Sequence, residues 1–257
     1  MVRALLIRGM LVGLLAGLLV FGFGKVFGEP QINRAVSFET ALDKAKAEKA
    51  KDTHVMEEPE LVSRKVQASF GLFTGVMVYS TAFGGLFGLV FAVADRRVVN
   101  LRPRAVSALL AASGFIAVYV VPNLKYPANP PAIGDPDTIR QRTALYFIML
   151  ACSVAAMVGA MVLRKRLAER LGGWNAALIA AGGYLIGVIA VACILPGINE
   201  VPDAFPADVL WQFRVVSFGM QLLMWSTIGL MFGALAERSM SLSRQFPSES
   251  RMQATLR

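Results

Sequence analysis

Four acidic side chains and a lone histidine have the chemistry to bind a divalent cation. The acidic residues lie in two proline-rich stretches, "KYPANPPAIGDPDT" and "PGINEVPDAFPAD", and the histidine lies in a third polar segment. Carboxylate oxygens and imidazole nitrogens are common ligands of hard and borderline metals. We therefore predict a metal site from this set: Asp135, Asp137, Glu200, Asp203 and His54.

A structural role is the alternative for these carboxylates, and the two roles are compatible. The sequences "GDPDT" and "FPADV" place aspartate next to an expected helix start, where aspartate caps the first backbone N–H groups. His54 would then be an ordinary polar surface residue. Nearby, Arg214 is a cation at the edge of an apolar run, and we expect Asp208 to be its partner because an unpaired charge there is costly.

Patterns typical of enzymes are missing from the sequence. It contains no nucleophile elbow, zinc-binding motif or phosphate-binding loop, so we predict neither catalysis nor a prosthetic group. Nucleic-acid binding is also disfavoured. The formal charge is +9, but the basic residues form short clusters beside apolar runs, where they face lipid headgroups.

The composition indicates a membrane protein. Hydrophobic residues make up 56% of the 257 residues and charged residues only 17%, which is too apolar for a soluble domain. A helix needs about 20 apolar residues to cross the hydrocarbon core. Six runs qualify, and we predict an all-α polytopic transmembrane bundle with spans at 5–27, 67–93, 105–122, 144–163, 174–196 and 213–236.

The first run resembles a signal peptide in its basic start and apolar middle. It is followed by "GKVFGEPQ", which has no small-x-small cleavage pattern. We therefore expect a retained helix, and five spans if it is not retained.

Basic residues predict the orientation. The loops "DRRVVNLRPR" and "RKRLAER" alternate with loops poorer in cations, so the positive-inside rule places both termini in the cytoplasm. The chain would form a single membrane domain over 1–257, with an extracytoplasmic charged loop at 28–66 that carries a short surface helix, and a cytoplasmic tail at 237–257.

Glycines recur at intervals of four in several spans, which places them on one helix face. The clearest sets are Gly9, Gly13 and Gly17, and Gly229 with Gly233. Such faces allow close helix packing. We expect packing within the chain, with a homo-oligomer or partner-subunit face as the alternative. Similar loops, "VVPNLKYP" and "ILPGINEVP", also suggest a threefold hairpin repeat in one orientation.

Three stretches of the chain resemble the CbtA family of predicted cobalt transporter subunits. They are the glycine-rich span after "VRALLIRGM", "VPNLKYPANPPAIGDPDTIRQRTALY", and the long stretch from "LPGINEVPDAF" to "GALAER". The resemblance implies a multi-pass protein of the bacterial inner membrane. It also implies a small single-span partner with a histidine-rich tail, and cobalt as the transported ion.

The residues fit this resemblance in one respect and fall short in another. Cobalt favours imidazole and carboxylate, and a chain with one histidine cannot assemble a multi-imidazole site alone. The external carboxylates would instead gather the ion in an outer vestibule, with Asp208 and Arg214 bracing its wall. The alternative is a non-transporting scaffold or assembly protein whose external loops dock a partner. Nickel and cobalt accept nearly the same ligands, so the metal itself is not fixed.

Overall fold

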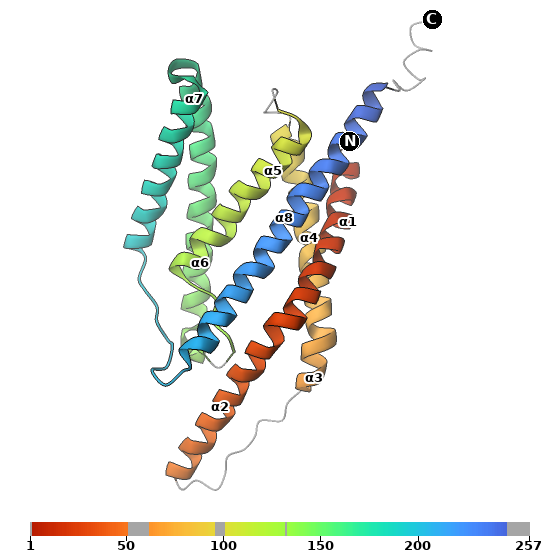
Figure 1. Ribbon diagram of the computed structural model, residues 1–257. Helices are drawn as coiled ribbons and strands as arrows, with labels where there is room; N and C mark the ends of the chain where they lie inside the picture. The colour runs from red at the N-terminus through yellow and green to blue at the C-terminus, as the bar shows by residue number, and fades with distance from the viewer. Residues whose placement is uncertain (1, 51–61, 96–100, 132, 246–257) are drawn as a thin grey trace, which may run out of the picture. The chain divides into compact units, whose positions relative to one another are not determined.

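The protein is all-helical in the computed structural model, which describes residues 2–50, 62–95, 101–131 and 133–245 (Figure 1). His54 of the predicted metal site lies outside these residues. The described part contains helices and connecting loops and no strand. Its elements are α1 (Val2–Phe23), the π-helix η1 (Gly24–Gly28), α2 (Glu29–Ala50), α3 (Arg64–Val66), the π-helix η2 (Gln67–Gly71), α4 (Leu72–Asp95), α5 (Pro103–Gly114), the π-helix η3 (Phe115–Val120), α6 (Val121–Lys125), the 3-10 turn η4 (Pro136–Thr138), α7 (Ile139–Ile194) and α8 (Ala207–Gln245).

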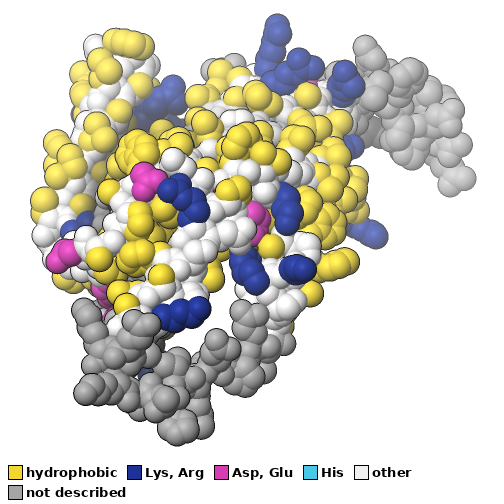
Figure 2. Space-filling model, turned by 60° about the horizontal axis from the view of Figure 1, so that its bottom comes forward, with side chains coloured by type: hydrophobic (Ala, Val, Ile, Leu, Met, Phe, Trp, Pro, Cys, Tyr) yellow, Lys and Arg dark blue, Asp and Glu magenta, His cyan; other side chains and the backbone are white. Residues whose placement is uncertain are grey.

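Five helical stretches in the described residues are long and apolar enough to cross a membrane. They are Val2–Leu42, Arg64–Asp95, Pro103–Lys125, Ile139–Ile194 and Ala207–Ser239. Many of their large hydrophobic side chains are exposed, and hydrophobic side chains cover much of the face seen in Figure 2. An exposed apolar surface of this kind needs lipid around it. The structure therefore agrees with the prediction of a multi-pass membrane protein.

Helix α7 contains two of the six predicted spans, 144–163 and 174–196. It is 56 residues long, more than twice the length that crosses one bilayer. Gly172 interrupts it with φ 77° and ψ 160°, and the chain reverses there (Figure 1). Glycine suits this position because it tolerates positive φ. The count of six depends on α7 crossing twice, and it stays a prediction, as does the repeat.

The contacts divide the chain into two compact units. Unit 1 comprises residues 1–23, 64–112 and 222–257, and unit 2 comprises residues 24–63 and 113–221. Unit 1 therefore contains α1, α4, most of α5 and the second part of α8. Unit 2 contains α2, η3, α6, α7 and the first part of α8, together with the two proline-rich loops.

Unit 1 is built on close contact between α1 and α4. The predicted glycine face of α1 lies on α4: Gly9 is against Gly84, and Gly13 is against Ser80 and Gly84. A methyl group added to Gly84 would lie 2.7 Å from Gly13 Cα, which is closer than real carbon atoms approach. The two backbones are thus in direct contact, and Gly17 continues the contact along α1 near Met77 and Ser80.

Small residues also join α5 to α8 within unit 1. The buried Ser107 hydroxyl donates to the Gly229 carbonyl at 2.7 Å, and a methyl group on Gly233 would lie 3.0 Å from Ser107 Cβ. Aromatic rings fill the space beside these contacts. Phe232 is fully buried and meets Phe91 edge to face at 5.0 Å.

The two arms of α7 form a helical hairpin in unit 2. Ser153 and Tyr184, one on each arm, share a hydrogen bond of 2.9 Å through their hydroxyls. Met149, Tyr184 and Val188 form a buried cluster beside this bond. Met149 and Ser153 of the first arm thus meet Val188 and Tyr184 of the second arm, so the two arms run antiparallel.

Helix α2 is longer than the short surface helix predicted for the 28–66 segment. The acid and base spacing that predicts this helix lies in "FETALDKAKAEKAKD", which begins at Phe38, whereas α2 begins at Glu29 directly after η1. The reason is packing. Ala35 is buried against Phe205 and Val209, and Phe38 meets Phe205 edge to face at 5.1 Å. These apolar contacts on one helix face extend α2 beyond its charged segment.

Candidate functional site

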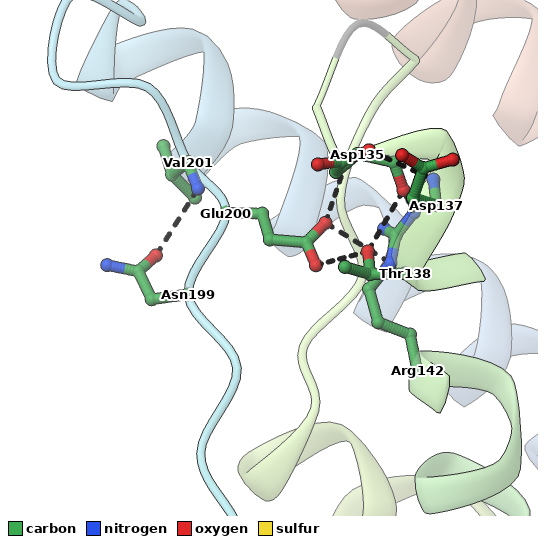
Figure 3. Close-up of polar contacts among 7 residues, drawn as sticks. All are labelled: Asp135, Asp137, Thr138, Arg142, Asn199, Glu200 and Val201. Carbon is green, nitrogen blue, oxygen red and sulfur yellow. Dashed lines mark hydrogen bonds and ion pairs between the residues drawn. The ribbon is translucent and has the colours of Figure 1, made fainter. Parts of the chain in front are cut away.

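Glu200 fastens the two proline-rich loops of unit 2 to each other (Figure 3). One loop joins α6 to α7, and the other, which carries Glu200, joins α7 to α8. The backbone N–H of Asp135 donates to Glu200 Oε2 at 2.9 Å, and the Thr138 hydroxyl donates to Glu200 Oε1. Arg142 Nε lies 3.2 Å from Glu200 Oε2 and completes an ion pair. We call Glu200, Asp135, Thr138 and Arg142 the loop brace.

Asp135 accepts hydrogen bonds from the residues at the start of α7, so it is part of the protein's own structure there. Its Oδ1 accepts the backbone N–H of Asp137 at 2.9 Å, and its carbonyl accepts the Thr138 N–H at 3.2 Å and the Thr138 hydroxyl at 2.9 Å. Arg142 Nη2 also donates to this carbonyl at 3.2 Å. These bonds form the 3-10 turn η4 and match the capping role expected of aspartate at a helix start.

Gly134 allows Arg142 to lie close to the loop backbone. Its φ is +123°, a conformation that glycine adopts without strain. A methyl group here would also lie 2.7 Å from Arg142 Cζ. The residue before Asp135 must therefore be small for the brace to form.

The surroundings of Glu200 stabilise its carboxylate. The hydrogen bond from the Thr138 hydroxyl contributes most to lowering the pKa of Glu200, followed by the Asp135 N–H and the Arg142 guanidinium. Partial burial opposes this shift but does not cancel it. The brace is therefore a charged arrangement that depends on ionised Glu200.

Arg214 and Asp208 have different partners from those predicted. Arg214 donates from Nε to the Ala128 carbonyl at 3.2 Å and from Nη2 to Asn129 Oδ1 at 2.8 Å. Asp208 instead forms an ion pair with Arg34 of α2. The predicted pairing of Asp208 with Arg214 is wrong because α2 supplies a closer cation, and the loop before α7 supplies neutral acceptors.

A cavity of about 690 Å³ lies beside the loop brace in unit 2. Its polar lining comes from both loops, the start of α7 and α8: Tyr126, Asn129, Arg142, Asn199, Glu200 and Arg214. Thr143 and Tyr146 of α7, with isoleucine, valine and proline side chains, form the remaining wall. This volume falls within the range of ligand-binding pockets, about 300–1,000 Å³.

The structure brings only part of the predicted metal set together. Asp135, Asp137 and Glu200 lie around one turn, but Glu200 and Asp135 use their carboxylates to bind protein N–H and O–H groups. Asp203 is exposed in the turn before α8. In the part of the chain that the structure describes, no three histidine, cysteine, aspartate or glutamate side chains are grouped to hold a metal ion.

Several important residues were not singled out from the sequence. Thr138 and Arg142 complete the loop brace, Asn129 binds Arg214, and Arg34 binds Asp208. Thr138 and Arg142 had a usable signal, because they follow "GDPD" in the first turns of an expected helix. Arg34 had none, because its partner is 174 positions away in the sequence.

Comparison with known proteins identifies a family and no individual relative. No curated protein and no solved structure matches the chain. The family model described as "Probable cobalt transporter subunit (CbtA)" matches residues 2–237, which include both braced loops and all of the described spans except the last two residues of the fifth. The chain therefore belongs to the CbtA family of probable cobalt transporter subunits.

Proposed function

We propose that this protein is the membrane-spanning subunit of a cobalt uptake system in a bacterial inner membrane. The observation that carries the proposal is the family match over residues 2–237, combined with five helical stretches able to cross a bilayer. Entry of the ion at the proline-rich loops requires that the loop brace faces the outside. The positive-inside distribution of lysine and arginine supports that orientation and places both termini in the cytoplasm.

We propose further that a small single-span partner with a histidine-rich tail supplies most of the metal ligands. Cobalt favours imidazole nitrogen, and this chain has one histidine. A partner tail would deliver the ion to the outer loops. The family description, which names a subunit, supports the existence of a partner.

The carboxylates of the outer loops divide into two roles in this proposal. Glu200 and Asp135 hold the loops in place through the brace. Asp137 and Asp203 have exposed side chains and would contact the incoming ion. His54 would assist them as a further ligand.

Uptake of labelled cobalt tests the proposal. Cells that express this chain together with its partner should accumulate more cobalt at limiting external concentration than cells lacking either protein. Excess unlabelled nickel in a parallel assay would establish the selectivity. Unchanged accumulation in cells that contain both proteins would contradict transport and favour the scaffold role.

A double substitution separates ion contact from loop structure. Asp137→Asn with Asp203→Asn should lower cobalt uptake severalfold at limiting metal while leaving the yield of folded protein unchanged. Glu200→Gln is the comparison, because it should lower uptake by loosening the loop brace and so speed amide exchange at Asp135, which the double variant should leave unchanged. Normal uptake by the double variant would rule out the exposed aspartates as ion contacts.

A further inference from the structure

The cavity beside the loop brace carries an unbalanced positive charge. In the described residues, its charged lining consists of Arg142, Arg214 and Glu200. Arg142 and Glu200 neutralise each other across 3.2 Å. Arg214 binds only the neutral oxygens of Ala128 and Asn129 in this part of the chain. Its charge therefore has no carboxylate counterpart in the cavity.

The Arg214 guanidinium also keeps donors for a ligand. A guanidinium has five N–H groups, and two hydrogen bonds to the described protein are present here, through Nε and Nη2. Asn129 and Ala128 hold the group in position, which reduces the entropy lost when a ligand binds. The fixed fork suits an oxyanion that accepts two parallel hydrogen bonds.

Further donors line the same space. Thr143 contributes a hydroxyl, and Asn199 accepts the Val201 N–H through Oδ1, which leaves its NH₂ group as a donor. Donors from several elements suit a tetrahedral group with several oxygens better than a planar carboxylate with two.

We propose that this cavity is a binding site for a phosphate group, held by Arg214. The phosphate would come either from a lipid headgroup or from free phosphate, and the recognition chemistry is the same. A free divalent cation is disfavoured, because the cavity carries an excess positive charge. The site is thus separate from the route proposed for cobalt, and it does not depend on the transport function.

Ligand-dependent thermal stability of the full-length protein tests this site. The protein is purified in a maltoside detergent without phosphate and titrated with sodium phosphate, short-chain phosphatidylglycerol or cobalt chloride, with sodium chloride at matched ionic strength as reference. We expect phosphate, phosphatidylglycerol or both to raise the melting temperature above the chloride reference. A response to phosphatidylglycerol alone assigns the site to lipid, and a response to inorganic phosphate shows that free phosphate binds.

Two substitutions at arginine show whether Arg214 is responsible. Arg214→Gln should weaken binding by about tenfold or more, because a charge-assisted contact is lost. Arg140→Gln is the matched control, since Arg140 is an exposed arginine at the start of α7 that does not line the cavity. Equal binding by the Arg214→Gln variant and wild type, or no stabilisation by either phosphate source, would overturn the proposal.

Asn129→Asp keeps the test valid if Arg214→Gln does not fold. Aspartate preserves the 2.8 Å contact with Arg214 and supplies the missing negative charge inside the chain. This variant should be at least as stable as wild type without ligand and should lose the response to phosphate. A full phosphate response in this variant would equally overturn the proposal, as would a cobalt response that Arg214→Gln abolishes.

Discussion

The α1–α4 contact of unit 1 and the loop brace of unit 2 both join segments that are far apart in the sequence. They do so by different physical means. The α1–α4 contact is made by glycines, and because glycine has no side chain, the backbones at Gly13 and Gly84 touch. The loop brace uses a charged side chain, Glu200, which reaches the Asp135 N–H, the Thr138 hydroxyl and the Arg142 guanidinium at the start of α7. The α1–α4 contact depends on the small size of its residues, and the loop brace depends on the charge of Glu200.

The difference follows from the surroundings of each region. Within the hydrocarbon core the hydrophobic effect does not drive helices together, so close van der Waals contact between small residues is the available means. Loops outside the core contain many backbone polar groups that need partners. A carboxylate with two acceptor oxygens can satisfy several of them at once. The two regions should therefore respond differently to changes in size, charge and pH.

The largest effect is expected from a change of size in the α1–α4 contact. Gly84→Leu would force side-chain atoms into the space occupied by Gly13, whose N and Cα would lie 2.9 and 2.7 Å from the new Cβ. Overpacking against a backbone costs at least about 1–3 kcal/mol. We expect a marked loss of folded protein in detergent and a lower midpoint in a denaturation series.

Gly75→Leu on the same helix is the control for that substitution. A methyl group at Gly75 has nothing within 4 Å, so leucine should be accommodated there. The helix propensity of leucine would even favour it. If both variants lose stability equally, helix α4 is sensitive to any leucine and the close backbone contact is not the cause.

The next effect is expected from removal of the charge in the loop brace. Glu200→Gln keeps the shape of the side chain but ends the ion pair with Arg142 and weakens the bond from the Asp135 N–H. Hydrogen exchange at the amides of Asp135, Asp137 and Thr138 should accelerate by up to about tenfold, because these amides open more often. Exchange in the α7 arms should not change. Uniform acceleration over the whole chain would instead mean that Glu200 supports global stability.

The fold was largely predictable because its signal is local. Long apolar runs marked each helix that can cross a membrane, and glycine spacing marked a face of α1 that meets α4. The length of α2 was missed because it depends on contacts with Phe205 and Val209, about 170 positions further along the chain. Hydropathy patterns carry no information about such a partner.

The site was predictable in its residue types and not in their pairing. The acidic residues of the proline-rich loops made Asp135 and Glu200 candidates for the site. An acidic residue, however, can bind a metal, cap a helix or accept hydrogen bonds from another loop. Only geometry decides among these. Glu200 is 62 positions from Thr138, and no spacing rule connects them.

A smaller effect is expected from pH, again in the loop brace and not in the α1–α4 contact. The folded-state pKa of Glu200 is lowered, so the contribution of its charge is complete above its unfolded pKa, about 4.3, and is lost as pH falls through the folded value. Exchange at the Asp135 amide, corrected for intrinsic rates, should rise as pH falls below about 4.3. Glu200→Gln should abolish that rise, and a rise that persists in this variant would point to another group.

The smallest effect is expected from the exposed ion pair of α2. The side chains of Arg34 and Asp208 are 46% and 56% exposed, whereas those of Arg142 and Glu200 are 27% and 16% exposed. Exposed ion pairs are screened by water and salt and contribute little. Arg34→Gln should therefore shift the melting temperature by about 1–2 °C or less, and that shift should shrink further as salt is added.

Arg104→Gln in unit 1 sharpens this last comparison. Arg104 is also exposed, but its partner Glu237, 2.9 Å away, is only 30% exposed. Removal of the arginine leaves a partly desolvated carboxylate, and the free-energy cost rises with the burial of the charge that remains. The melting temperature should thus fall further for Arg104→Gln than for Arg34→Gln. The reverse order would show that the exposed ion pair of α2 contributes more to stability than the partly buried pair of unit 1.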